Sequence, residues 1–201
     1  MAKPKCSIDT IRMMGGYCGI DQGVSGAIAF IKTFPKSGLE LLVYDMPTLI
    51  IGSGRKSKKT GKEGKKKILD FARIKKILSI NRPSYTIVEK LQIAGRGTDK
   101  KFHQSAQSVA TTAMNGGIIL GMLFMAGFPY EEILASQWQK IFFKPTKGMD
   151  SKRLSYNAAC KLFPSYSDEF IGERGGIKDG RADAALLALV AKRKYWGEDM
   201  I

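Results

Sequence analysis

Four acidic residues occupy positions where the surrounding sequence is otherwise apolar. Asp21 and Glu89 each follow an apolar run, so we expect each carboxylate at the end of a strand. Asp179 and Asp183 begin a helical segment that is apolar nearly all round, and their spacing of four residues puts both on one helix face. Charges in such surroundings are costly when unpaired, which indicates that something offsets them.

The four carboxylates are an all-oxygen set without histidine or cysteine pairs, which suits magnesium or manganese. Two such ions, about 3.5 to 4 Å apart, can activate water and stabilise the leaving oxygen in phosphodiester hydrolysis. Simpler roles remain open. Asp21 can accept hydrogen bonds from the turn amides of Gly23 or Ser25, and Asp179 can act only as an N-cap. Neither role explains Asp183 on the first turn of a core helix.

The charge balance of the chain predicts a polyanionic partner. Its 201 residues include 33 Lys and Arg against 18 Asp and Glu, a formal net charge of +15, and nucleic acid is the first candidate. An anionic membrane is the weaker alternative, because the basic residues do not alternate with bulky apolar ones on an amphipathic helix. The most apolar stretch, residues 113–128, falls short of the roughly 20 residues that a membrane span requires, so we expect a packed core helix and no membrane.

Three basic segments are candidates for contacts with DNA. Residues 52–67 hold eight basic residues, one acid and no aliphatic or aromatic residue, which predicts a mobile loop that is either a phosphate-binding arm or merely solvated. Residues 93–103 form a glycine-rich basic loop, and residues 144–148 form a basic turn. His103 could be a general acid, a phosphate contact or an ordinary surface histidine. The candidate contacts are Arg55, Lys56, Lys58, Lys59, Arg96, Lys100, Lys101, Phe102, His103 and Lys147.

The elements that must position the acids follow from the hydrophobic pattern. The chain is long enough to bury a sizeable core, and we expect one domain over residues 1–201. Three strands with short connections predict an antiparallel meander, and two later strands are separated by helical segments. The expected strands are residues 17–21, 27–31, 39–46, 85–90 and 130–135, and the expected helices are residues 68–78, 104–125, 152–162 and the segment from 179 onward.

This order of elements and motifs resembles the ribonuclease H-like superfamily, and within it the RuvC-type Holliday-junction resolvases with their phage and chloroplast branches. The resemblance runs from about Tyr17 to Lys194. It implies an α/β fold in which a five-stranded mixed sheet, three antiparallel strands followed by two parallel ones, is flanked by helices. The matching stretches are Gly19–Ala27, Tyr44–Thr48, Val88–Lys90 and Asp179–Ala184.

The resemblance also implies roles for individual residues. Asp21, Glu89, Asp179 and Asp183 would bind two magnesium or manganese ions, Lys140 and Lys152 would lie by the scissile phosphate, and Phe102 would separate bases at the junction centre. The substrate would be a four-way DNA junction, and the working unit a homodimer.

Two departures from the family pattern concern the acids. Gln22 stands where relatives usually have proline. The aspartates at 179 and 183 are four residues apart, as in the chloroplast branch, whereas the corresponding acids of bacterial relatives are three residues apart. The resemblance therefore supports the role of Asp179 less strongly than the roles of the other three acids.

Three functions therefore stay open at the level of sequence. The first is a junction-resolving nuclease, the second is a ribonuclease H-like nuclease for other branched DNA or RNA–DNA hybrid, and the third is a non-catalytic DNA-binding relative. The intact acid set counts against the third. For the dimer, a stripe of small residues offers close approach either to the sheet or to a second subunit: Ala106, Ala110, Ala113, Gly117 and Gly121.

Cysteine usage bears on the compartment. Cys6, Cys18 and Cys160 form neither a close ligand pair nor an even disulfide framework, which favours a reducing environment and argues against structural zinc. The first residues lack an unbroken apolar run, so we do not expect secretion. The expected location is the cytoplasm of a bacterial or virus-infected host cell, or an organelle matrix.

Overall fold

The computed structural model describes residues 16–34, 38–56, 61, 63–91, 106–144 and 150–198, and the side chains of 53, 55 and 56 lie outside that description. Its centre is a five-stranded sheet in the order β3-β2-β1-β6-β7. β1 pairs antiparallel with β2, and β2 with β3, while β1–β6 and β6–β7 are parallel. The predicted mixed sheet is thus confirmed. Its strands are β1 (Tyr17–Asp21), β2 (Ala27–Phe34), β3 (Gly38–Asp45), β6 (Tyr85–Glu89) and β7 (Tyr130–Ile133).

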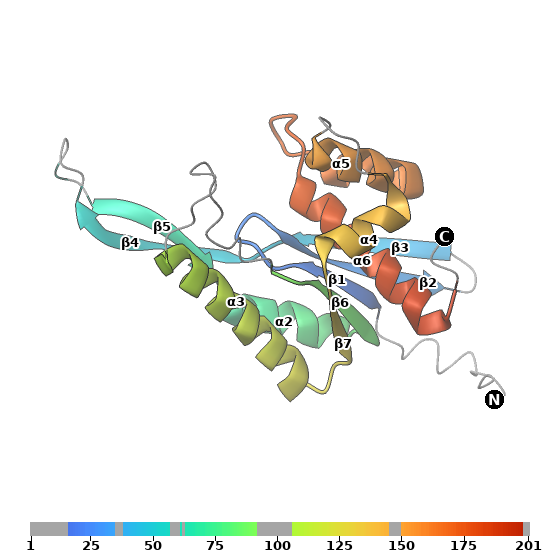
Figure 1. Cartoon of the computed structure of the whole chain (residues 1–201), viewed down its shortest axis with the longest axis horizontal. Coiled ribbons are helices and arrows are strands. Elements are labelled where there is room, and N and C mark those ends of the chain that lie inside the picture. The colour runs from blue at the N-terminus through green and yellow to red at the C-terminus, as the bar shows by residue number, and fades with distance from the viewer. Residues whose placement is uncertain are drawn as a thin grey trace.

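Helices cover both faces of the sheet (Figure 1). On one face lie α4 (Ala135–Phe142), α5 (Ser151–Leu162), the 3-10 helix η2 (Pro164–Phe170) and α6 (Asp179–Trp196), and on the other lie α2 (Phe71–Asn81) and α3 (Ala106–Met125). Each face has its own apolar core. β2 supplies both by strict alternation, because successive strand side chains point to opposite faces: Ala27, Ala29 and Ile31 enter the α6 core, and Ile28 and Phe30 enter the α2–α3 core.

α6 lies directly against β1, with backbone close to backbone. A Cβ on Gly19 would overlap the Ala184 carbonyl oxygen and the Ala188 backbone nitrogen. Small residues on the facing side of α6 make this approach possible, since Ala184, Ala185 and Ala188 are fully buried. The contact brings the first turns of α6, with their two aspartates, to the strand end that carries Asp21.

The expectation of a mobile loop over residues 52–67 is wrong for residues 52–56 and 63–67, which are strands, and residues 57–60 and 62 lie outside the described part of the chain. β4 (Thr48–Lys56) and β5 (Glu63–Leu69) pair antiparallel as a hairpin that projects from the body at the left of Figure 1. Its base is anchored by buried Leu69 and by a 2.9 Å hydrogen bond from the Asp70 N–H to the Pro47 carbonyl. Backbone hydrogen bonds join the two strands, and most of their described side chains are exposed.

The hairpin also moves the predicted start of the next helix. Residues 68 and 69 are the end of β5, and α2 begins at Phe71. The Asp70 side chain accepts a 3.0 Å hydrogen bond from the Arg73 N–H, which is the usual N-cap arrangement. The sequence pattern predicts an earlier start because Ile68 and Leu69, at the end of β5, happen to continue the helical spacing of the apolar residues in α2.

The expectation that the apolar helix is a packed core element is also wrong in part. Only one face of α3 packs on the sheet, through Gly116, Ile119 and Leu123. Phe124 and Met125 are 72% and 83% exposed, and the five residues of the small-residue stripe are all exposed. The stripe therefore does not lie against the sheet. By length and composition alone, α3 is also apolar enough to cross a membrane, with a mean hydropathy of 1.4.

The close contact between α6 and β1 predicts a large cost for a single methyl group. We expect Gly19→Ala to lower the free energy of unfolding by roughly 1–3 kcal/mol or more, because helix and strand must separate. Gly117→Ala is the matched control. No atom lies within 4 Å of its added Cβ, and alanine favours a helix by up to about 1 kcal/mol. Urea unfolding measures both, and equal effects would contradict the packing described.

Candidate active site

Asp21 and Glu89 lie side by side at the carboxyl ends of adjacent parallel strands. The register pairs Ile20 with Val88, so the next residue on each strand is the acid. Burial is the main cause that raises the pKa of Asp21 to about 6. The charge of Asp179 adds to it, while a hydrogen bond from the Gly23 N–H opposes it. Burial, followed by the charge of Asp21, raises the pKa of Glu89 to about 7.

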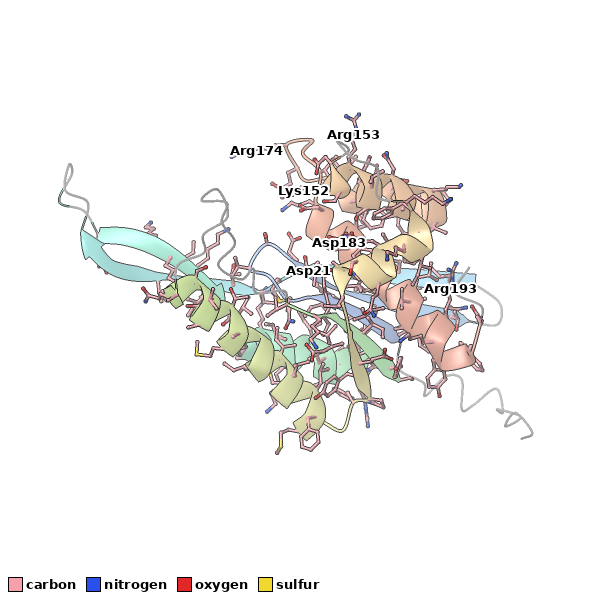
Figure 2. The ribbon with its side chains drawn as sticks, viewed as in Figure 1. Asp21, Lys152, Arg153, Arg174, Asp183 and Arg193 are labelled. Carbon is pink, nitrogen blue, oxygen red and sulfur yellow. The ribbon has the colours of Figure 1, made fainter. Side chains whose placement is uncertain are left out.

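Asp183 completes the cluster from the first turns of α6. Burial, with added repulsion from Asp21, Glu89 and Asp179, raises its pKa to about 7. A hydrogen bond with buried Ser155 of α5 opposes that rise. Figure 2 shows Asp21 and Asp183 in the same region between the sheet and the α5 layer, with Lys152 above them. Strand ends and a helix start thus bring together acids far apart in sequence.

Asp179 pairs with a lysine rather than capping its helix. Its Oδ2 lies 2.8 Å from the Nζ of Lys152, on the first turn of α5, and the N-cap position of α6 is Lys178. The Asp179 carboxylate raises the pKa of Lys152. Lys152 remains 64% exposed, so its ammonium can also reach a ligand. Lys140 lies exposed in the last turn of α4 and takes part in none of the ion pairs of the described residues.

Two side chains that the sequence analysis did not assign to the site hold Glu89 in place. The indole Nε1 of fully buried Trp138 donates a 3.0 Å hydrogen bond to Glu89 Oε2. Gln22, which is only 3% exposed, donates from Nε2 to the Glu89 carbonyl oxygen at 2.7 Å. The carboxylate and the backbone of one acid are thus fixed from two different elements.

A charged clamp fixes the start of α6 to the edge strand β3, at the end of the sheet that also carries Asp21. Arg181 donates to both carboxylate oxygens of Asp45, at 2.7 and 3.0 Å, and to the Glu169 carbonyl at 2.8 Å. This bidentate hydrogen bond is the main cause that lowers the pKa of Asp45. Because Arg181 lies between the two aspartates of α6, the clamp sets the orientation of the turns that carry them.

The glycines of the acidic motifs are required by close approach. A Cβ on Gly180 would overlap the backbone of Ser25 and Gly26. A Cβ on Gly26 would overlap the carbonyl and carboxylate of Asp21. The first turn of α6 therefore sits on the turn that follows Asp21, which a side chain at Gly180 would prevent, whereas a side chain at Gly26 would displace Asp21 itself.

The residues present fit a divalent metal site. Asp183 Oδ1 is buried and has no hydrogen-bond partner within the described part of the chain, which leaves an oxygen for a cation. The pKa values of Asp21, Glu89 and Asp183 are raised first by desolvation and then by the charge of neighbouring carboxylates, and a bound cation would offset both effects. No three acidic, histidine or cysteine side chains among the described residues are already spaced as a finished site. The chemistry of the donor set, all carboxylate oxygens, is that of magnesium and manganese.

Most predicted DNA contacts lie outside the described residues. Arg55 and Lys56 are in β4, and their side chains are not described. The remaining eight are outside the described ranges: Lys58, Lys59, Arg96, Lys100, Lys101, Phe102, His103 and Lys147. Their proposed roles stay predictions.

The sheet order and the flanking helices define the RuvC type of the ribonuclease H-like fold. Two solved structures of Thermus thermophilus RuvC, one of them in complex with a Holliday junction substrate, match with a TM-score of 0.51 each. They are 14% and 16% identical to this chain, and each match covers 90% of this chain and 95% of the other. The yeast mitochondrial Holliday junction resolvase Ydc2 matches at a TM-score of 0.48 with 12% identity, covering 94% of this chain and 85% of its own. No protein-family model and no curated protein matches the sequence.

The buried acids predict an unusual dependence of stability on pH. The folded pKa values of Asp21, Glu89 and Asp183 lie above their unfolded values, so the folded state keeps protons that the unfolded state has lost. In the absence of divalent ions, the free energy of unfolding should fall by a few kcal/mol between pH 5.5 and pH 8. Urea unfolding across this range measures it.

Asp183→Asn is the matched variant for that experiment. Its amide cannot ionise, so we expect a flatter pH dependence and higher stability than wild type at pH 8. A wild-type stability that is constant or increases from pH 5.5 to pH 8 would contradict the clustering of the three acids.

Proposed function

We propose that this protein is a metal-dependent endonuclease that resolves four-way DNA junctions by paired, symmetric nicks, a crossover junction endodeoxyribonuclease. The observation that carries the proposal is the cluster of Asp21, Glu89 and Asp183, with Asp179 beside it, in a fold of the RuvC type. A structural protein has no evident use for three half-buried carboxylates that repel one another, whereas a nuclease needs them to bind cations.

In this proposal, Asp21, Glu89, Asp179 and Asp183 hold two magnesium or manganese ions. When bound, the ions supply an activated water and stabilise the leaving 3′ oxygen of a phosphodiester. Trp138 and Gln22 keep the Glu89 carboxylate and backbone in one orientation before the substrate arrives. Rigid supports of this kind matter because cleavage depends on the placement of the acids to within a fraction of an ångström.

Lys152 is the basic residue best placed to contact the phosphate that is cut. It lies on the first turn of α5, it pairs with Asp179, and it is largely exposed. A phosphate oxygen could bind the Lys152 ammonium in place of, or together with, the Asp179 carboxylate. Lys140 stays a weaker candidate for the same role.

Two alternatives differ from the proposal in substrate or in chemistry. A nuclease with this site could cut other branched DNA or an RNA–DNA hybrid, and a non-catalytic relative would bind DNA without cutting it. The deciding experiment compares cleavage of a four-way junction, a duplex, a flap and an RNA–DNA hybrid with magnesium or manganese. Preferential paired cutting of the junction supports the proposal, and equal cutting of the hybrid would replace it.

Substitution of the acids should separate cleavage from binding. We expect Asp21→Asn, Glu89→Gln and Asp183→Asn each to lower junction cleavage by at least about a thousandfold, because the amides keep shape but lose the charge that holds the ions. Junction affinity should stay within about threefold of wild type, since phosphate contacts dominate it. Asp168→Asn and Glu132→Gln, at exposed acids outside the site, are the matched controls.

A readout independent of cleavage follows from the metal site. Millimolar magnesium should raise the thermal midpoint of wild type at pH 8, because a cation that binds only the folded state stabilises it. The same addition should leave Asp183→Asn nearly unchanged. Cleavage at wild-type rate by any of the three acid variants would remove that acid from the site.

We also propose that the working unit is a homodimer. Resolution of a junction into two duplexes takes nicks in two strands related by a two-fold axis, and one site makes one nick at a time. The exposed apolar side of α3, with Met114, Phe124 and Met125, is the surface we assign to the second copy. Beside it runs an apolar groove of about 530 Å³ between α2 and α3, lined in part by Leu78 and Phe128.

A charged substitution on the exposed apolar side of α3 tests the dimer. Phe124→Glu should shift the protein from dimer to monomer in light scattering at micromolar concentration, because a carboxylate would be buried at the interface. Leu162→Glu, at an exposed apolar position on α5, is the control and should stay dimeric. A wild-type monomer that still makes paired cuts would overturn the dimer proposal.

The compartment remains part of the proposal. Cys18 is buried and free, and burial raises the pKa of its thiol; Cys160 is free as well. Both are consistent with a reducing environment inside a cell. We propose no membrane partner, because Ile119 and Leu123 already commit one face of α3 to the sheet.

A further inference from the structure

The strand hairpin and the first half of α3 enclose a groove that the proposed chemistry does not use. Its volume is about 660 Å³. Three segments line it: Gln22–Ser25 in the turn after Asp21, Lys65–Lys67 on β5, and the polar side of α3 at Gln107, Ser108, Thr111, Thr112 and Asn115. The groove therefore begins at the residue that follows a proposed metal-binding acid.

The two long walls of the groove differ in chemistry. On the hairpin side, Lys65, Lys66 and Lys67 are exposed, and Lys65 and Lys67 point to the same face of the strand. Their spacing along the strand is about 6.6 Å, close to the separation of consecutive phosphates in an extended polynucleotide. None of the described residues that line the groove is acidic. The nearest acid on the lysine face of β5 is Glu63, whose carboxylate accepts a 2.8 Å hydrogen bond from the Gly54 N–H.

The α3 wall is polar and uncharged. Its five residues recur at helical spacing along one face, and all carry hydroxyl or amide groups that can donate and accept hydrogen bonds. Amide and hydroxyl side chains read base edges, whereas lysines bind the backbone. Phe124 and Met125 of the proposed dimer surface lie further along α3, whereas Met114 lies between Thr112 and Asn115 in the chain.

The chemistry of the two walls favours an unpaired strand, because polar side chains on α3 can bond base edges that pairing would otherwise occupy. A volume of about 660 Å³ lies within the range of roughly 300–1,000 Å³ that accommodates a drug-sized ligand, which corresponds to a very short stretch of nucleotides. The groove also opens at the turn that holds Asp21 through the Gly23 N–H, at 3.3 Å.

We propose that this groove binds a short stretch of unpaired DNA strand next to the cleavage site, with phosphates on Lys65 and Lys67 and base edges on Thr112 and Asn115. The inference rests on the proposed function and adds its substrate detail: the strand to be cut is led to the acids unpaired. The hairpin is thus a wall of a single-strand site, and more than a general attachment arm.

The first experiment measures binding of a 12-nucleotide DNA single strand and of the corresponding duplex as a function of salt. Lys65→Ala/Lys67→Ala should weaken single-strand binding about tenfold and reduce the slope of log affinity against log salt by about 1.4, the value for two lost phosphate contacts. Duplex affinity should change by less than twofold. Lys75→Ala/Lys76→Ala, on exposed lysines of α2, removes the same charge and should alter neither.

The second experiment tests the α3 wall. Thr112→Val and Asn115→Leu remove hydrogen-bonding groups at similar volume. Wild type should bind single strands made of different single bases with different affinities, and both variants should reduce those differences. Unchanged base preference in both variants, or equal weakening of single strand and duplex by the lysine pair, would overturn the proposal. Circular dichroism confirms that each variant is folded.

The groove and the proposed function can fail separately. If wild type cuts junctions but the lysine pair does not affect single-strand binding, the groove proposal is wrong and the nuclease stands. If wild type cuts no junction while single-strand binding depends on Lys65 and Lys67 as described, the groove stands and the proposed function is wrong.

Discussion

The rest of the molecule depends on the contact of α6 with β1 and with the turn after it. Glycine at 19 and 180 lets the backbone of α6 meet that of β1 and of the following turn without side chains between them, and glycine at 26 leaves room for the Asp21 carboxylate. At ordinary helix-to-sheet separation, the aspartates of α6 would stand well away from Asp21. The motif glycines are therefore part of the site although none of them touches a substrate, because they set how far apart the carboxylates are.

That contact creates an electrostatic problem that the surrounding groups only partly relieve. Three half-buried carboxylates repel one another, and each accepts a hydrogen bond from a different source: a turn amide for Asp21, an indole for Glu89 and a hydroxyl for Asp183. Such donors favour the charged form but supply no counter-charge. The Lys152 ammonium relieves only part of the repulsion at Asp21, so a bound cation would stabilise the cluster, which is the arrangement expected where stability is given up for function.

The two faces of the sheet divide the work. The α4–α6 face carries the acids and the supports that orient them, including the Arg181–Asp45 clamp. The α2–α3 face presents an exposed apolar helix whose first half is polar and faces the hairpin. Chemistry, partner contact and strand binding can therefore occupy adjoining surfaces of one small domain without competing for the same side chains.

The sequence by itself placed Asp21 and Glu89 at strand ends and Asp179 and Asp183 at a helix start, and the family resemblance supplied the mixed sheet. Strand periodicity and the acid at the end of each apolar run are local signals, and parallel strand ends must meet at one edge. The sequence did not reveal the hairpin of β4 and β5, because the apolar residues Leu49, Ile50 and Ile51 are exposed and β5 begins with charged residues, so no apolar alternation marks the pair. The sequence could not show which side of the apolar helix α3 is buried, because hydropathy does not indicate which face packs on the sheet.

Only the tertiary structure decided which groups support the acids. Trp138 reaches Glu89 across 49 residues of chain, and Arg181 reaches Asp45 across 136. Contacts of that range depend on how helices sit on the sheet, which is a property of packing between elements and has no local trace in the sequence. The residues that do the proposed chemistry were readable from their own neighbourhoods, whereas the residues that orient them became visible only once the chain had folded.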